Sequence, residues 1–153
     1  MYLTQDYKDI VELFNKHHVK YLIAGAFAMS KVGYSRSTYD IDLWVEKRHE
    51  NALNIFNALE EFGLPFSLNP DDFLEPNSVI QIGVVPNRID ILTDIDGVVF
   101  EEAWANKKEV SFGDITSYSL NIDHLIKNKM ASNRPKDKLD LEQLKEIVRL
   151  SKS

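Results

Sequence analysis

The sequence predicts an α+β (α/β) fold, in which helices pack on a mixed β-sheet of four to six strands. Short apolar runs that end at glycine, proline or asparagine alternate with segments whose apolar residues recur at helical spacing. The resulting order is helix, strand, helix, strand, helix and two strands, with two helices closing the chain. A length of 153 residues fits one core, so residues 1–153 are expected to form one domain.

The first half of the chain contains three predicted helices and two predicted strands. Helical spacing of apolar residues predicts helices over about 5–18 and 48–62, and a short helix over 26–29. The apolar run 21–24 ends at a glycine and predicts a buried strand. Residues 41–45 begin with alternation of apolar and polar side chains and predict a second strand.

The second half begins with an expected loop over 64–77, which is rich in Pro, Asn and Asp. Two strands follow over 79–84 and 88–92, joined by the turn at Pro86 and Asn87. The remaining predicted elements are a short helix over 99–105, short outer strands over 110–112 and 116–120, and closing helices over 122–132 and 136–150. Asn121 or Asp123 is expected to cap the first closing helix, and Pro135 suits the first turn of the second.

Composition narrows the class of protein. The chain has no cysteine, which excludes a disulfide framework and a thiolate metal site. It has no apolar run of about 18 residues, so no membrane span is expected, and its N-terminus lacks an apolar signal core. These features favour the cytoplasm. A net charge of −6 gives little long-range attraction to nucleic acid.

Three aspartates in two predicted strands are the candidate metal ligands. Asp40 and Asp42 are two residues apart, so on a strand their side chains point to the same face. Two adjacent carboxylates are costly without a cation, and together they suit Mg²⁺ or Mn²⁺. Asp90 joins them if its strand lies beside theirs, where it is placed to act as a general base. The alternatives are a solvated strand end for the pair and an outward position on an edge strand for Asp90.

Gly25 is a candidate for contact with phosphate. It stands directly after an apolar strand and before a short helix. A glycine at such a turn lets the backbone approach a phosphate closely, and the amides that follow it are donors. The alternative is an ordinary tight turn between a strand and a helix.

In this order, these motifs resemble the DNA polymerase β-like nucleotidyltransferase superfamily. Its signature is a glycine-led strand-to-helix turn, an acid–apolar–acid strand and a later strand with a third acid. The chain looks most similar to the small bacterial group of minimal nucleotidyltransferases and abortive-infection toxin enzymes, in which a lysine and a small residue precede Arg-Pro-x-Asp-x-x-Asp. The resemblance covers about residues 20–145. The matching positions are 21–28, Gly33, Arg36, Thr38, 40–45 and 123–141.

The resemblance implies a nucleotidyltransferase fold and a metal-dependent enzyme. Such an enzyme transfers a nucleoside monophosphate from an NTP, for example ATP, to a hydroxyl acceptor and releases pyrophosphate. Mg²⁺ or Mn²⁺ is held by Asp40, Asp42 and Asp90. The acceptor classes are a small molecule, a protein side chain and a tRNA end, and the partners are a second copy of the chain or an antitoxin. The implied nucleotide-binding residues are Gly25, Ala26, Arg36, Thr38, Lys129, Arg134 and Asp137, the last orienting Lys129 or Arg134.

One departure from the superfamily pattern keeps a second function open. Many members have a serine or glycine after the turn glycine, whereas this chain has Ala26 and lacks the serine hydroxyl. Backbone amides can still contact phosphate there. The alternative is a non-catalytic nucleotide-binding domain that acts as a regulatory or toxin–antitoxin partner. A sugar transferase that uses the acid pair for a nucleotide-sugar is a weaker third possibility.

Several other residues have competing interpretations. Arg36 either borders the triphosphate or pairs with Asp40 at the surface. Lys129 and Arg134 either contact the nucleotide or complement a helix dipole. Trp44 either stacks on a base or fills the core. The acids at 94 and 96 precede Gly97 and are expected to belong to a turn rather than to a second metal site.

Overall fold

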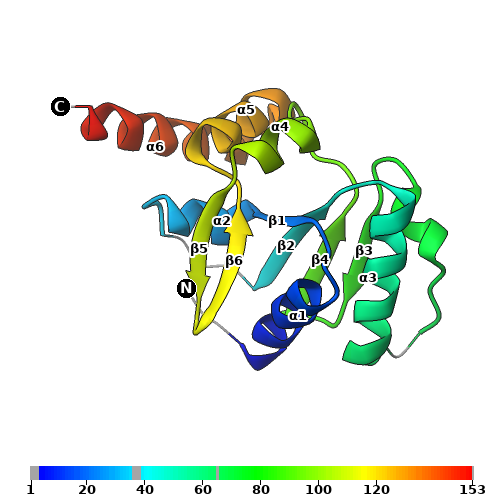
Figure 1. The fold of residues 1–153 in the computed structure, drawn as a ribbon. Helices are drawn as coiled ribbons and strands as arrows, with labels where there is room; N and C mark the ends of the chain where they lie inside the picture. Colours follow the sequence, from blue (N-terminus) through cyan, green and yellow to red (C-terminus); the bar gives the residue numbers. More distant parts are fainter. Residues whose placement is uncertain (1–3, 36–38, 65, 153) are drawn as a thin grey trace.

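The computed structural model describes residues 4–35, 39–64 and 66–152. In this part of the chain six strands form one mixed sheet with the order β3-β4-β2-β1-β6-β5 (Figure 1). The predicted α+β fold and the two C-terminal helices are confirmed. In chain order the elements are α1 (Gln5–Lys16), β1 (Tyr21–Ala24), α2 (Gly25–Lys31), β2 (Asp40–Val45), α3 (His49–Phe62), the 3₁₀ helix η1 (Pro70–Leu74), β3 (Val79–Ile82), β4 (Arg88–Leu92), α4 (Phe100–Ala105), β5 (Lys108–Phe112), β6 (Ile115–Ser119), α5 (Ile122–Ser132) and α6 (Pro135–Ser151).

Strand directions in the centre of the sheet position the site. β2 pairs with β1 in antiparallel fashion and with β4 in parallel fashion. A parallel pair needs a crossover connection, and here α3, η1 and β3 lie between the two strands in the sequence. The start of β2 therefore lies beside the start of β4 and beside the end of β1. Side chains from three segments that are distant in the sequence meet at this corner.

The hydrophobic core lies between the sheet and its helices. Figure 1 shows α1 and α3 side by side against the sheet, while α5 and α6 form a pair at one end of it. All four residues of β1 are buried, as in a strand that is covered on both faces. α1 buries one apolar stripe made of Tyr7, Ile10, Val11 and Phe14. No helix in the described ranges combines the length and the apolar character needed to cross a membrane.

Helix ends follow the capping signals of the sequence. The Thr4 side chain accepts a hydrogen bond from the Tyr7 amide at 3.2 Å, which caps α1. Asn121, one of the two expected caps of α5, accepts from the His124 amide at 2.8 Å. α6 begins at Pro135, as predicted. Gly63 ends α3 with a φ of 87°, a conformation that glycine adopts without a steric penalty.

The structure differs from the predicted elements in several places, three of them between residues 64 and 92. The expected loop over 64–77 contains η1, whose start has a reciprocal capping box between Asn69 and Asp72. β3 ends at Ile82 rather than at residue 84, because Gly83 turns the chain with a φ of 77°. β4 has β3 on one side and β2 on the other, so the edge-strand alternative for Asp90 was wrong.

Candidate active site

Three carboxylates meet where β2 and β4 begin. The parallel register places Asp42 opposite Asp90 and Asp40 opposite Arg88. Because residues two apart on a strand share a face, all four side chains project from the same side of the sheet. Asp40, Asp42 and Asp90 each offer a carboxylate oxygen, and these oxygens lie within 4.8 Å of one another. The structure therefore brings the three predicted metal ligands together as one acidic triad.

Gly25 is in direct contact with the triad. Ala24, the last residue of β1, pairs with Asp42, and the chain then turns into α2 through Gly25 with a φ of 64°. A Cβ atom on Gly25 would lie 2.4 Å from Asp42 Oδ2. A side chain is excluded here both by this contact and by the left-handed backbone. The glycine therefore leaves room for the carboxylate.

Arg88 is a member of the site that the sequence interpretation missed. Its Nη2 donates to Asp40 Oδ2 at 2.7 Å and to Asp90 Oδ2 at 3.1 Å, and its Nε donates to Asp90 Oδ1 at 2.9 Å. The guanidinium thus bridges two of the three carboxylates. The signal was present in the sequence, because Arg88 stands two residues before Asp90 and so shares its face.

Crowding of the carboxylates changes their acidity. The pKa of Asp42 is raised to about 7, first by burial and then by the charges of Asp40 and Asp90, while Lys129 and Arg88 act against them. Burial also raises the pKa of Asp90, against the hydrogen bond and charge of Arg88. The local cations therefore do not fully offset the cost of gathering these charges.

A second acidic cluster joins α5 to α6. Lys129 Nζ lies 3.2 Å from Asp137 Oδ1 and 3.4 Å from Asp140 Oδ2, and all three residues are buried. Asp137 Oδ2 also accepts from Ser132 Oγ at 2.6 Å and from Arg134 Nε at 2.8 Å. Burial raises the pKa of Asp137, but these hydrogen bonds outweigh it and hold the pKa well below its usual range.

The two clusters are close enough to interact. The charge of Lys129 lowers the pKa of Asp42, so α5 places its ammonium near the triad. Asp137 bonds to both Lys129 and Arg134, which matches the geometry that the resemblance implies for it. Whether Lys129 and Arg134 bind a nucleotide stays a prediction. Arg36 and Thr38, the other two implied nucleotide-binding residues, lie outside the described residues.

Tyr7 is a second residue near the site that sequence reasoning did not single out. It is buried at the start of α1, and its hydroxyl donates to the Pro86 carbonyl at 3.1 Å. Burial raises its pKa to about 12, with further contributions from the charges of Asp40 and Asp90. The hydroxyl therefore stays protonated and links α1 to the turn that precedes β4.

The rival acids and the tryptophan have structural contacts. Asp94 Oδ2 accepts from Lys47 Nζ and from the Asn77 amide, both at 2.7 Å. Asp96 and Gly97 form a turn, as expected. Trp44 is 2% exposed and packs edge-on against Phe100, with ring centroids 4.9 Å apart. The interpretation of Trp44 as a core residue is therefore the one that the structure favours.

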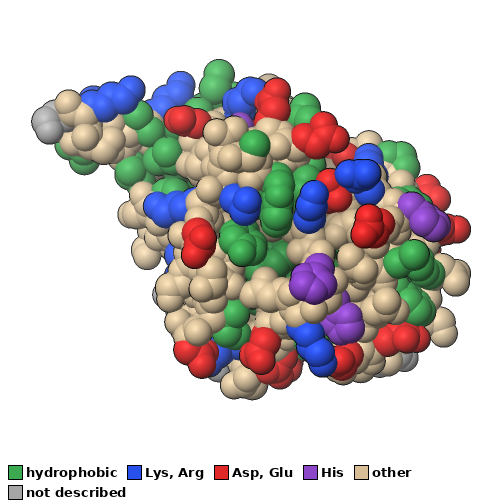
Figure 2. Space-filling view, viewed as in Figure 1, with side chains coloured by type: hydrophobic (Ala, Val, Ile, Leu, Met, Phe, Trp, Pro, Cys, Tyr) green, Lys and Arg blue, Asp and Glu red, His purple; other side chains and the backbone are tan. Residues whose placement is uncertain are grey.

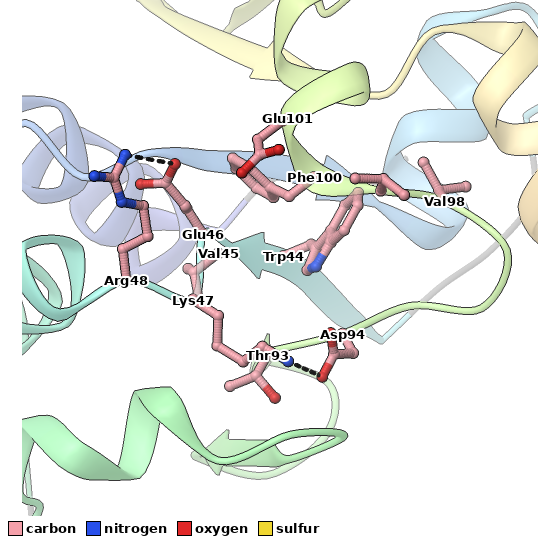
Figure 3. A pocket seen from close by; sticks show the side chains of 11 residues that line it. Trp44, Val45, Glu46, Lys47, Arg48, Thr93, Asp94, Val98, Phe100 and Glu101 are labelled. Atoms are coloured by element: carbon pink, nitrogen blue, oxygen red, sulfur yellow. Dashed lines mark hydrogen bonds and ion pairs between the residues drawn. The ribbon is translucent and has the colours of Figure 1, made fainter.

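A cavity of about 320 Å³ lies at the other end of β2, where Trp44 pairs with Leu92 (Figure 3). Its wall includes the ion pairs Lys47–Asp94 at 2.7 Å and Arg48–Glu46 at 4.0 Å. The triad lies at the opposite end of the same two strands. This cavity is therefore separate from the acidic site, and four of its charged side chains form these two ion pairs.

The donors in the triad fit a divalent cation. Mg²⁺ and Mn²⁺ favour carboxylate oxygens, and the fold supplies three of them within 4.8 Å. The raised pKa of Asp42 shows that added positive charge would stabilise its ionised form. The missing Cβ of Gly25 allows the Asp42 carboxylate to occupy this position. On these observations Asp40, Asp42 and Asp90 are the residues that would hold the metal.

Comparison with known proteins identifies the fold. No protein-family model and no curated protein sequence matches the chain. Among solved structures, it is similar to the lincosamide antibiotic adenylyltransferase LnuA in its lincomycin-bound form. The TM-score is 0.61 at 17% identity, over 95% of this chain and 98% of LnuA. It is also similar to a nucleotidyltransferase-like protein from Thermotoga maritima, with a TM-score of 0.56 at 17% identity, over 99% of this chain and 94% of that one. The chain therefore has the fold of the nucleotidyltransferases, as its sequence motifs predict.

Proposed function

We propose that this chain, acting as one domain over residues 1–153, transfers a nucleoside monophosphate from an NTP to a hydroxyl acceptor. The observation that carries the proposal is the convergence of Asp40, Asp42 and Asp90 within 4.8 Å on a nucleotidyltransferase fold. Three buried or half-buried carboxylates from adjacent strands are unfavourable in a purely structural role. A divalent cation and a triphosphate supply the charge pattern that makes such an arrangement useful.

In this proposal the residues have distinct roles. Asp40, Asp42 and Asp90 hold Mg²⁺ or Mn²⁺, which would neutralise charge on the phosphates and position the reacting oxygens. Gly25 and Ala26 present backbone to the triphosphate. Arg36, Thr38 and the half-exposed Arg134 contact its oxygens. Lys129 supplies a fixed positive charge near Asp42, and Asp137 holds both Lys129 and Arg134 in place.

The reaction follows from these positions. An acceptor hydroxyl oxygen forms a bond to the α-phosphorus of the NTP, and the bond from that phosphorus to the bridging oxygen of the β-phosphate breaks. Pyrophosphate leaves with the electron pair of the broken bond. Asp90 accepts the hydroxyl proton, a role for which a raised pKa is favourable. Catalysis is then largely a matter of positioning and of charge neutralisation.

Substrate choice can be ordered for testing. LnuA is an adenylyltransferase that acts on an antibiotic, so ATP is the first NTP to test and a small hydroxylated molecule the first acceptor. Protein side chains and tRNA ends are the other acceptor classes. On the face seen in Figure 2, Lys and Arg side chains are interspersed with Asp and Glu. That mixture, with a net charge of −6, disfavours an extended nucleic-acid contact on this face.

Transfer of label tests the proposal. The protein is incubated with each α-labelled NTP, Mg²⁺ and cell extract, and both labelled products and pyrophosphate are measured. Asp42→Asn is expected to abolish transfer while the domain stays folded. Asp96→Asn makes the same chemical change at an exposed turn and is expected to keep wild-type transfer. Wild-type transfer by Asp42→Asn would show that the assigned site is wrong.

Ala26 supports a second candidate function. Without a serine hydroxyl in the phosphate turn, the chain could bind a nucleotide without reacting and serve as a regulatory or toxin–antitoxin partner. Calorimetry separates the two functions. Heat of NTP binding without release of pyrophosphate, with any acceptor, favours the non-catalytic function. Release of pyrophosphate together with a labelled acceptor rules it out.

A further inference from the structure

Arg88 places its positive charge inside the acidic triad. Among residues 4–35, 39–64 and 66–152, its three side-chain hydrogen bonds go to Asp40 or Asp90, at 2.7, 2.9 and 3.1 Å. The planar guanidinium has the shape needed to span two carboxylates, which a lysine ammonium lacks. Arg88 therefore supplies positive charge to the same oxygens that the proposed function assigns to a metal.

We propose that Arg88 is a tethered counter-cation, which competes with the divalent metal for Asp40 and Asp90 and must move off them before the metal is fully bound. The proposal rests on the proposed function, because it takes the triad to be the metal site. It adds a residue outside the expected ligand set. It also means that the metal displaces the Arg88 guanidinium when it binds, instead of entering a site that is already free of positive charge.

The position of the Arg88 guanidinium is the reason that it would compete with a metal ion. Nη2 of Arg88 lies between Asp40 Oδ2 and Asp90 Oδ2. A Mg²⁺ ion binds carboxylate oxygens at roughly 2.0–2.1 Å, so an ion that bridges these two aspartates needs the space that Nη2 holds. Two positive groups at such short range, at a partly buried site, repel each other strongly. Binding of the guanidinium and of a metal ion to Asp40 and Asp90 at the same time is therefore unfavourable.

The surroundings of Arg88 allow it to leave. Its side chain is 29% exposed, so it reaches solvent without opening the core. Among the residues that the structure describes, its side-chain hydrogen bonds go to these two aspartates, so a metal on the same carboxylates would replace the side-chain bonds that departure breaks. In the described part of the chain no hydrogen bond joins Arg88 to Asp42, so Asp42 keeps its place against Gly25 when Arg88 leaves.

Calorimetric titration with Mn²⁺, without nucleotide, tests this inference. The proteins are wild type, Arg88→Gln, Arg88→Lys, Asp42→Asn and the control Arg149→Gln, which changes an exposed arginine paired with Glu146. Arg88→Gln is expected to bind Mn²⁺ at least about tenfold more tightly than wild type, since one competing charge is gone. Its thermal midpoint without metal falls, and saturating Mn²⁺ raises that midpoint by more than it does in wild type. Arg149→Gln is expected to match wild type.

Each outcome decides a specific point. Equal or weaker Mn²⁺ binding by Arg88→Gln, with binding lost in Asp42→Asn, overturns the role of Arg88 and leaves the metal site standing. Unchanged Mn²⁺ binding by Asp42→Asn overturns both the metal site and the counter-cation. If Arg88→Gln fails to fold, Arg88→Lys carries the test: it keeps the charge but not the fork, so tighter binding than wild type supports the proposal and unchanged or weaker binding overturns it.

Discussion

The two acidic clusters of this fold contain the same kind of group in opposite electrostatic states. In the triad, Arg88 contacts two of three carboxylates, and the pKa values of Asp42 and Asp90 are raised. In the α5–α6 cluster, Lys129 and Arg134 bond to Asp137, and its pKa is lowered. Carboxylates in the first cluster are stabilised by a proton or an added cation, whereas Asp137 in the second is already stabilised as an anion.

This difference indicates a ligand-binding role for the triad and a structural role for the α5–α6 cluster. A carboxylate cluster with raised pKa values has an unfavourable electrostatic energy in its ionised form, which a bound cation can lower, and functional sites often have this property. A cluster with satisfied charges holds its elements in place, and here it fixes the junction of α5 and α6 next to the triad. Four variants test this division, in order of decreasing effect on the free energy of unfolding.

The largest expected loss comes from Lys129→Met. Removing the ammonium leaves Asp137 and Asp140 buried together without their shared cation. Breaking a buried pair in this way typically destabilises a protein by about 3–5 kcal/mol. Urea unfolding measures the loss. Lys127→Met, on the exposed face of the same helix, should change stability by less than about 0.5 kcal/mol. Similar losses in both variants would contradict the supporting role of the cluster.

Asp42→Asn should have the opposite sign in metal-free protein. The pKa of Asp42 is raised from its ordinary 3.8 to about 7, so the folded state binds a proton that the unfolded state releases. That contribution to stability is complete below pH 4 and is lost as the pH rises to 7. Wild type should therefore lose stability over this range. Asp42→Asn should lose less and be more stable at pH 8 by up to about 4 kcal/mol.

Unfolding at several pH values in EDTA measures this difference. Asp137 provides the contrast, because its pKa is lowered, and its contribution is present above pH 4 and lost on acidification. Asp137→Asn should therefore destabilise the protein at pH 8. Stabilisation by both substitutions, or by neither, would remove the distinction between the clusters.

Gly25→Ala is expected to cost about 1–2 kcal/mol from the left-handed backbone alone, and more from the contact with Asp42 Oδ2. Gly63→Ala is the matched control, since its φ of 87° is also positive but a Cβ there meets nothing within 4 Å. Gly25→Ala alone should weaken Mn²⁺ binding, measured by calorimetry. Equal effects in the two variants would mean that the glycine contributes only conformational freedom.

The smallest effect should come from Arg134→Ala. Its side chain is 58% exposed, and the buried Asp137 keeps its bonds to Lys129 and Ser132 when Arg134 is removed, so the loss should be less than about 1 kcal/mol. Stability is expected to change little, while binding of NTP, measured by titration, weakens if Arg134 contacts the triphosphate as proposed. Loss of stability comparable to that of Lys129→Met would assign Arg134 to support instead.

Local sequence patterns predicted the helices and strands, but they did not predict which strands pair in the sheet. β1 matches the predicted bounds because an apolar run that ends at glycine defines a strand locally. The same-face pairing of Asp40 and Asp42 follows from the period of a strand. The pairing of Asp42 with Asp90 depends on a crossover through α3, which no local pattern contains. The metal and nucleotide roles of these residues stay predictions.

The missed residues show where sequence reasoning was incomplete. Arg88 shares the face of Asp90 by the rule applied to the first two aspartates, but that rule was not extended to it. The burial of Lys129 depends on how α6 folds back on α5, because its partner Asp140 lies on that next helix. Tyr7 reaches the site only through tertiary packing of α1.

Register in the β2–β4 ladder has a consequence for how the chain tolerates change. Ile41 and Ile89 are buried on the face opposite to the four charged side chains. A slip of β4 by one residue would turn its two charges into the apolar layer and its isoleucines outward. An insertion or deletion that shifts this pairing would therefore destabilise the fold, and not only displace the acidic side chains. Burial of the isoleucines under the strands therefore fixes the register that aligns the carboxylates on the other face.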